Sequence, residues 1–380
     1  MKKTLIAVAT LSAMAASAMA AQVTLYGKID QGFQVQKTKV TGSESSTTFK
    51  GTSGISSGSR WGLKGTEELA DGYTVGFVFE SKIDSMTGTG GDTDLNKLFN
   101  RDAYLSLDTP FGQLVVGRTG MLSDGCTGDI ISGFASPFGT SYGLAASTKN
   151  TFSDMLGGRT DRAIRYISPK FAGFKVHAEF ANMNAGGDMS SKQRYGGVGV
   201  SYANGPLYVA IAGETIRGSA DQQKLYDNPK FLSLAANYDF GVAKVFAGYQ
   251  YAKDAPVNAT IKGTTVTNKS AYGTTINKVG KNDGFAFVGK YNAGTLGVSA
   301  PIGNGTLMAS VAYRKGTYQW KDMPEIDVKW MTGALGYKYN LSKRTYLYTD
   351  IAYGKEEWKY QSLKQSGKVT EFNAGICHNF

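Results

Sequence analysis

Apolar side chains alternate with small or polar ones in short segments along the chain. Residues 73–80 put one set on odd positions and another on even positions: Tyr73, Val75, Phe77 and Phe79 against Thr74, Gly76, Val78 and Glu80. The same period recurs in residues 174–181, 244–251 and 306–314. A period of two predicts β-strands whose two faces meet different surroundings. Alternation alone fits a soluble β-sandwich as well.

The connections between these segments alternate in length, and this feature tests whether the strands form a soluble β-sandwich or another β-architecture. Seven tight turns are expected, at 70–72, 109–112, 169–173, 204–205, 239–241, 303–305 and 341–343. Eight long polar stretches lie between them, near 38–57, 84–97, 119–158, 183–192, 217–229, 254–282, 315–327 and 355–366. This count predicts sixteen strands with both termini on the tight-turn side, the pattern of an outer-membrane β-barrel. Aromatic residues that end apolar faces suit a girdle at the membrane interface: Tyr238, Tyr251, Tyr313, Tyr339 and Tyr353.

The first twenty residues have the features of a secretory signal peptide. Lys2 and Lys3 precede an apolar stretch from about Leu5 to Ala16, and Ala18-Met19-Ala20 supplies small residues for cleavage. The apolar stretch is too short for a spanning helix. We therefore expect residues 1–20 to be removed and residues 21–380 to form one exported barrel in a bacterial outer membrane.

The composition supports strands and turns and argues against other classes. The chain has 22 Tyr, 19 Phe and 49 Gly but only 8 Pro, and residues 21–380 contain no apolar run long enough for a spanning helix. The net charge of +11 is spread without a basic block, so we assign it to lumen and surface and expect no nucleic-acid partner. Cys126 and Cys377 are expected to be inert thiols, with a disulfide as the alternative, and no metal or cofactor is expected.

The surrounding lipid requires the sheet to close. No strand edge can stay unpaired in lipid, so the sheet must close into a barrel. A barrel of sixteen strands is too wide for side chains to fill, so water fills it.

Several segments resemble the Gram-negative general porins, in order and over essentially all of residues 21–380. Residues 23–30 (VTLYGKID) and 59–67 (SRWGLKGTE) resemble the first two strands, and residues 111–118 resemble the turn and strand before the constriction loop. The end, residues 375–380 (GICHNF), is similar to the last strand of β-proteobacterial and neisserial-type porins, although Cys377 stands where a basic residue is common.

The resemblance implies a homotrimer in which each barrel has its own pore, narrowed by an inward-folded third loop. It also implies that the last strand is read by the outer-membrane assembly machinery, through an aromatic face that ends the chain: Phe372, Ala374, Ile376, His378 and Phe380. The expected partners are therefore other copies of the chain, outer-membrane lipid and lipopolysaccharide, that machinery, and the small solutes and ions that pass through.

The longest connection, near 119–158, is where the constriction loop belongs. Its segment 136–139 (SPFG) resembles a Pro-Glu-Phe-Gly segment of enterobacterial porins from which the Glu is missing. Asp124, Asp129 and Asp154 remain as loop acids. A loop of this length in a compact fold is usually functional or disordered, and inside a barrel we favour function.

Basic residues match or lie near the pore cluster of the family: Lys28, Arg60, Lys64, Arg118, Arg159 and Arg165. Alternation independently puts Lys28, Arg60 and Lys64 on the lumen face, and Arg159 and Arg165 on one parity, whereas Arg118 rests on the resemblance alone. Snorkelling of basic residues at the membrane rim is the alternative. With Asp124 and Asp129 opposite, this excess of positive charge predicts a mild anion preference.

Three other functions compete with a general pore. A substrate-specific porin would need a binding site, for which the lumen residues Tyr346, Tyr348 and Asp350 are a candidate sugar-stacking surface, although ordinary barrel wall is favoured. A barrel enzyme would need a nucleophile and a base, and His177, one of only two His, is read as a solvated lumen residue rather than a titrating gate. An adhesin would use the long loops to bind a host or matrix.

Overall fold

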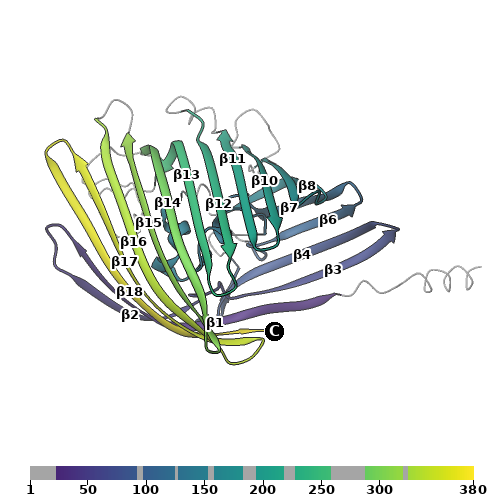
Figure 1. Ribbon diagram of the computed structural model, residues 1–380, viewed down its shortest axis with the longest axis horizontal. Coiled ribbons are helices and arrows are strands. Elements are labelled where there is room, and N and C mark those ends of the chain that lie inside the picture. The colour runs from purple at the N-terminus through teal and green to yellow at the C-terminus, as the bar shows by residue number, and fades with distance from the viewer. Residues whose placement is uncertain are drawn as a thin grey trace, which may run out of the picture.

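The computed structural model describes residues 23–91, 97–124, 127–152, 158–182, 194–217, 227–257, 287–319 and 324–380. The predicted signal peptide lies outside these residues. Nearly all of the described chain is antiparallel β-strand, and the strands join in one closed sheet (Figure 1). Within the described residues, no helix is long and apolar enough to cross a membrane.

The strands follow one another around the barrel in chain order. The first half of the wall comprises β1 (Thr24–Val40), β2 (Ser46–Ser53), β3 (Arg60–Ala70), β4 (Tyr73–Asp84), β5 (Thr89–Gly90), β6 (Ala103–Thr109), β7 (Gly112–Gly120), β8 (Arg159–Ile167) and β9 (Phe174–Asn182). The second half comprises β10 (Arg194–Asn204), β11 (Leu207–Arg217), β12 (Lys230–Asp239), β13 (Lys244–Val257), β14 (Phe287–Ile302), β15 (Gly305–Gln319), β16 (Ile326–Asn340), β17 (Thr345–Tyr360) and β18 (Leu363–Asn379).

The expected sixteen-stranded antiparallel barrel is confirmed. Of the 18 strands, β5 has two residues and belongs to a connection. β2 and β3 pair with successive parts of β1, β2 with Gln31–Thr38 and β3 with Thr24–Lys28, so together they form one interrupted strand. Sixteen wall strands remain.

The barrel closes where the last strand meets the first. β18 pairs with β1 from Asn379 opposite Lys28 to Gly367 opposite Val40. Phe380 and Gly27 then exchange two backbone hydrogen bonds, of 3.2 and 3.1 Å. A Cβ atom on Gly27 would lie 2.5 Å from Cζ of Phe380, so the terminal ring takes the space that a side chain at position 27 would fill. The contact between the first strand and the C-terminal residue therefore closes the sheet.

The predicted turns and the predicted apolar outer face are confirmed. Each of the seven tight turns joins two strands at the expected place. The apolar parity is exposed on the outer surface, as expected of side chains that meet lipid: Phe79, Val176, Val245, Val311, Tyr313, Tyr339 and Tyr353. Phe372, Ile376 and Phe380 of the last strand are also exposed on the outside, and their recognition by the assembly machinery stays a prediction.

Three of the predicted long loops were wrong in extent, because the strands continue through them. Residues 355–366 form the tip of the β17–β18 hairpin, with Tyr360 opposite Leu363. β2 lies within 38–57, and β15 and β16 extend into 315–327. At the hairpin tip Lys355, Glu357 and Lys359 take the outward positions, so the alternation continues with polar instead of apolar side chains.

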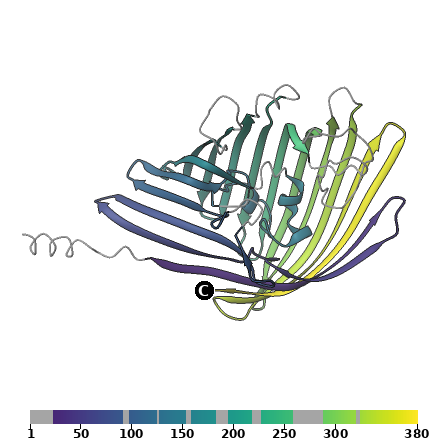
Figure 2. The same cartoon turned by 180° about the vertical axis from the view of Figure 1, so that it is seen from behind.

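The third long connection folds into the barrel, as expected. After β7 it forms η1 (Ser132–Phe134), η2 (Gly143–Ala145) and α2 (Ser147–Thr151). η1 contacts β12, η2 contacts β16 and β17, and α2 contacts β14 to β16. Figure 2 shows these short helices inside the wall, seen from behind. The loop thus crosses the lumen from the β7–β8 side to the opposite wall.

Candidate pore constriction

Glycines on the inner face of the far wall make room for the constriction loop, residues 121–152. A Cβ atom on Gly297 would meet Cγ of Pro137 at 3.0 Å, and one on Gly336 would meet Cε1 of Phe138 at 2.7 Å. The SPFG segment is therefore the part of the loop that sits in these notches. Phe138 is 3% exposed, so this segment is an anchor of the loop.

Hydrogen bonds also attach the loop to the wall. The Leu144 N–H donates to Glu371 on β18 (2.8 Å), and the Tyr208 hydroxyl donates to the Ile130 carbonyl (2.9 Å). The Tyr142 N–H donates to the carbonyl of Ile55, which belongs to the segment between β2 and β3 (2.5 Å). Burial raises the pKa of the Tyr142 phenol, so its ring packs as a neutral group.

The segment between β2 and β3 is itself held by a buried carboxylate. Asp30 accepts hydrogen bonds from the Ser56 hydroxyl and the Ser57 N–H, both at 2.6 Å, and from the Tyr348 hydroxyl at 2.6 Å. The Tyr346 hydroxyl lies 3.0 Å from the Ser56 hydroxyl. Tyr346 and Tyr348 thus brace the lumen lining, which is the barrel-wall role favoured from the sequence.

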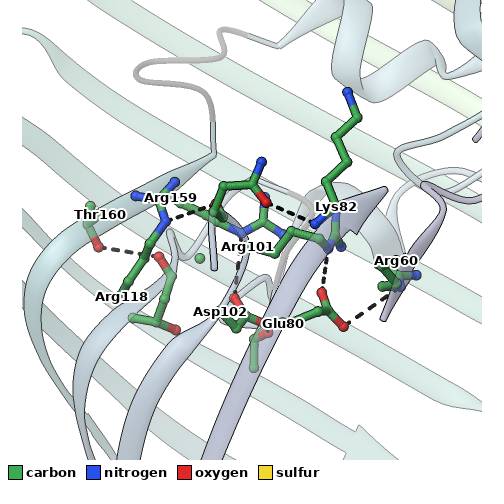
Figure 3. Close-up of polar contacts among 12 residues, drawn as sticks. Arg60, Glu80, Lys82, Arg101, Asp102, Arg118, Arg159 and Thr160 are labelled. Carbon is green, nitrogen blue, oxygen red and sulfur yellow. Dashed lines mark hydrogen bonds and ion pairs between the residues drawn. The ribbon is translucent and has the colours of Figure 1, made fainter. Parts of the chain in front are cut away.

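Basic side chains gather on the wall at β3, β4 and the start of β6 and β8 (Figure 3). Glu80 lies between two guanidinium groups: Arg101 bonds to Oε1, and Nε of Arg60 is 3.8 Å from Oε2. Nε of Arg159 is 3.5 Å from Asp102, which also accepts a hydrogen bond from Thr127 of the loop. The acids thus hold the three guanidinium groups in place.

Two lysines complete the basic side of the lumen. Nζ of Lys28 donates to the Ser57 hydroxyl (3.0 Å), which also accepts a hydrogen bond from Arg60 (3.1 Å). Lys64 lies over the ring of Tyr26, with Nζ 5.1 Å from its centroid. The register and these contacts place Lys28, Arg60, Lys64 and Arg159 on the lumen side of the wall, and their part in a constriction stays a prediction.

The predicted lumen position of Arg118 was wrong. The register puts Arg118 opposite Ala103, and Ala103 opposite Phe79, whose ring is exposed on the outer surface. Residues in one cross-strand row share a face, so Arg118 lies on the outer side of the wall. There it bonds to Asp161 (2.5 Å), which also accepts from Lys97 (2.6 Å).

Arg165 faces inward but is covered by the loop. It is 1% exposed, forms an ion pair with Glu179 and lies directly beneath Gly128. Arg159 and Arg165 both have partners on the lumen side, Asp102 and Glu179, but regular alternation does not connect them, because the β7–β8 register shifts beside Arg162, whose φ is 52°. Thr160 and Arg165 consequently both reach Glu179.

The loop acids differ in their surroundings. Asp129 accepts hydrogen bonds from the N–H groups of Ile131, Ser132 and Gly133 at 2.6–2.8 Å, so its carboxylate shapes the turn into η1. A Cβ atom on Gly158 would lie 3.0 Å from Oδ2 of Asp124, which places Asp124 where the loop returns to β8. Asp154 lies outside the described residues.

Sequence reasoning missed the charges that share the site with Arg60. Arg101 and Asp102 directly precede β6, where a short strand gives too little alternation to assign faces. Alternation put Glu80 on the face opposite Phe77 and Phe79, but nothing in the sequence pairs it with two arginines. Lys82, opposite Arg60 in the register, is a further basic residue of this face.

Two other residues that the sequence singled out lie on the lumen side. Cys377 is a buried free thiol, and Cys126 lies outside the described residues. His177 is 7% exposed with Nε2 2.9 Å from the Ser201 hydroxyl, so it is a packed wall residue and the expectation that it is solvated was wrong.

Comparisons with known proteins agree with this architecture. The family model described as Gram-negative porin matches residues 5–357. An outer membrane porin protein of Bordetella pertussis is 33% identical, with 100% of both chains covered, and outer membrane porin protein 32 of Delftia acidovorans is 32% identical, with 94% of this chain and 90% of that protein covered.

Solved structures show the same fold. An anion-selective porin from Comamonas acidovorans superposes with a TM-score of 0.62 and 25% identity over 95% of this chain and 100% of that one. OmpT of Vibrio cholerae, solved in a trimer form, has a TM-score of 0.62 at 16% identity, over 95% of this chain and 100% of that one.

The closed barrel, the inward loop and the charged lumen are the parts of a diffusion channel, and the relatives are channel proteins. The chain belongs to the Gram-negative porin family and forms a water-filled channel of the outer membrane for passive diffusion of ions and small hydrophilic solutes.

Proposed function

We propose that this pore prefers small anions and that its selectivity arises at Lys28, Arg60, Arg101 and Arg159. The observation that carries the proposal is the charge balance at one height of the lumen, where these four cations accompany three acids, Asp30, Glu80 and Asp102. Fixed charges of one sign at a narrow, water-filled passage raise the local concentration of the opposite ion. The similarity to an anion-selective porin supports the same sign.

We also propose that three copies of the chain associate, each with its own pore, as the resemblance to the family implies. Residues 1–20 would direct the export that precedes this assembly. The trimer form of a protein with the same fold supports this arrangement. Solutes would pass through the pore by diffusion, without a catalytic step. A preference for one solute would show as saturable block of the ion current by that solute.

The test is a reversal potential measured across a planar bilayer in a KCl gradient. The wild-type pore should favour chloride modestly, and Arg60→Glu should move the reversal potential toward potassium. The shift should shrink as salt rises, because the Debye length falls from about 10 Å at 0.1 M to about 3 Å at 1 M. Lys253→Glu is the matched control, since Lys253 lies on β13 with its side chain 49% exposed on the outer face. An unchanged reversal potential for Arg60→Glu at low salt would contradict the constriction role of Arg60.

A further inference from the structure

The residues between β2 and β3, 54–59 (GISSGS), form a bulge in the wall, which we call the β2–β3 bulge. β3 and β2 pair with successive parts of β1 and leave only Ile29 and Asp30 of β1 opposite the whole bulge. The chain turns back on itself at Gly54, whose φ is 77° and whose Cβ position lies 3.0 Å from Cα of Gly58. Residues in excess of their partners leave the ladder and bend the strand, and here they leave it toward the lumen.

Asp30 holds the bulge at both ends and in the middle. Its backbone carbonyl accepts a hydrogen bond from the Gly54 N–H (2.9 Å), and its backbone N–H donates to the Ser59 hydroxyl (3.0 Å). Its carboxylate, which is fully buried, accepts from the Ser56 hydroxyl and the Ser57 N–H. A buried network whose members are all satisfied is rigid. The bulge therefore has a fixed shape and a fixed direction.

The bulge contacts both the constriction loop and the basic wall. The Ile55 carbonyl accepts a hydrogen bond from the Tyr142 N–H of the loop. The Ser57 hydroxyl accepts from Nζ of Lys28 (3.0 Å) and from Nη2 of Arg60 (3.1 Å). The bulge thus joins the two parts of the site, although its residues carry no charge.

Ser57 connects two like charges. Lys28 and Arg60 stand directly opposite each other in the β1–β3 register, and like charges in that position repel. A hydroxyl has two lone pairs and one proton, so an Oγ atom that accepts from both cations turns its own O–H away from them. Ser57 is only half-buried, so this O–H can donate to water or to an anion in the passage. Three hydrogen-bond donors therefore lie together at one point of the lumen.

We propose that the β2–β3 bulge is a second constriction element beside the inward loop, and that Ser57 is a positioning residue for anion passage. This inference rests on the proposed anion preference. Ser57 acts by holding Lys28 and Arg60 together at the passage. Without its oxygen, repulsion drives Arg60 toward Glu80, whose Oε2 is 3.8 Å from Nε, and drives Lys28 toward Asp30. A cation that pairs with an acid attracts permeating anions less, so the anion preference falls.

The first test is the reversal potential of the assembled protein in a dilute KCl gradient. Ser57→Ala should lower the chloride-to-potassium permeability ratio by about two-fold, a modest factor because water keeps the dielectric constant of the lumen high. Ser57→Thr keeps the hydroxyl and should keep the wild-type ratio. Ser56→Ala is the matched control, because the neighbouring Ser56 hydroxyl bonds to Asp30 instead of to the cations. In a pore that carries Lys28→Met and Arg60→Gln, Ser57→Ala should add no further change, since the hydroxyl acts through these two cations.

The wild-type ratio and the difference between variants answer separate questions. A wild-type pore without chloride preference would contradict the proposed function. A chloride-selective wild type whose ratio is unchanged in Ser57→Ala would overturn the positioning role of Ser57 and leave the proposed function standing. A further two-fold change in the pore without the two cations would also overturn that role.

Thiol modification tests the place of the bulge independently of ion preference. In a chain with Cys126→Ser and Cys377→Ser, Ser57→Cys should react with a negatively charged methanethiosulfonate, and the single-channel current should fall when it does. Ser56→Cys is the control and should react about ten-fold more slowly, because Ser56 is buried and thiol reactivity depends on access. A current that stays at its starting value after mass spectrometry shows complete modification at position 57 would overturn the place of the bulge in the passage.

Discussion

The backbone N–H of Leu144 donates a hydrogen bond of 2.8 Å to Oε1 of Glu371, joining the constriction loop to the last strand of the barrel. Glu371 is 3% exposed and also accepts from Gln36 (3.0 Å) and Asn373 (3.1 Å). A buried carboxylate that accepts several hydrogen bonds is a fixed attachment point. The position of the loop in the lumen therefore depends on a residue 227 positions away in the sequence.

Glu371→Ala should loosen the loop without opening the barrel. The Leu144 N–H then loses its acceptor, at a cost of about 1–3 kcal/mol if no water replaces it. We expect single-channel currents with larger fluctuations between conductance levels than in the wild-type pore. Glu357→Ala is the control, since Glu357 is an acid of neighbouring β17 whose side chain is 45% exposed and ion-paired with Lys355. Equally quiet currents in both variants would show that the hydrogen bond does not hold the loop.

Phe77 and Thr74 test the assignment of faces on β4. Phe77 pairs with Leu105, which is 55% exposed on the outer surface, whereas Thr74 has the opposite parity. Phe77→Arg should destabilise the barrel by about 2–4 kcal/mol if the residue lies near the bilayer midplane. Thr74→Arg should be tolerated and should change conductance instead. The measurement is denaturant unfolding from lipid vesicles, and an equal loss of stability in both variants would refute the parity.

The barrel itself could be predicted from the sequence because its wall imposes one rule on every strand. Lipid outside and water inside demand alternation, and residues such as Val311 and Tyr313 obey it. The alternation of apolar and polar residues is weaker where the outer face of the strands no longer contacts lipid. At the β17–β18 tip both faces carry polar residues, so a hairpin was read as a loop.

The constriction was only partly predictable, because it depends on contacts between distant segments. Parity assigned Lys28, Arg60 and Lys64 to the lumen, since each lies in a regular strand. Arg118 was misplaced because Leu114, Val115 and Val116 give no alternation to read. The register shift beside Arg162 likewise has no signature in the sequence, because it depends on how β8 meets β7.

Arg118 provides a direct test of its revised position. Arg118→Gln removes an ion pair with Asp161 on the outer side of the wall, where Lys97 still bonds to Asp161. We expect the reversal potential to stay at the wild-type value and stability to fall by about 1 kcal/mol or less, since both side chains are partly exposed. A shift of the reversal potential toward potassium as large as that of Arg60→Glu would show that Arg118 lies in the lumen.

The junction of the chain ends should control assembly. The ring of Phe380 occupies the space above Gly27, so Phe380→Ala removes packing from the seam, while Gly27→Ala forces the ring away and also crowds the Arg60 carbonyl oxygen, 2.5 Å from the new Cβ position. Both variants should lower the yield of SDS-resistant, heat-modifiable oligomer. Phe380→Tyr keeps the ring and should assemble normally, which separates loss of packing from any change at the terminus. If Phe380→Ala assembles as well as Phe380→Tyr while Gly27→Ala fails, the seam needs the small residue but not the terminal aromatic ring, and the proposed role of Phe380 in assembly would be wrong.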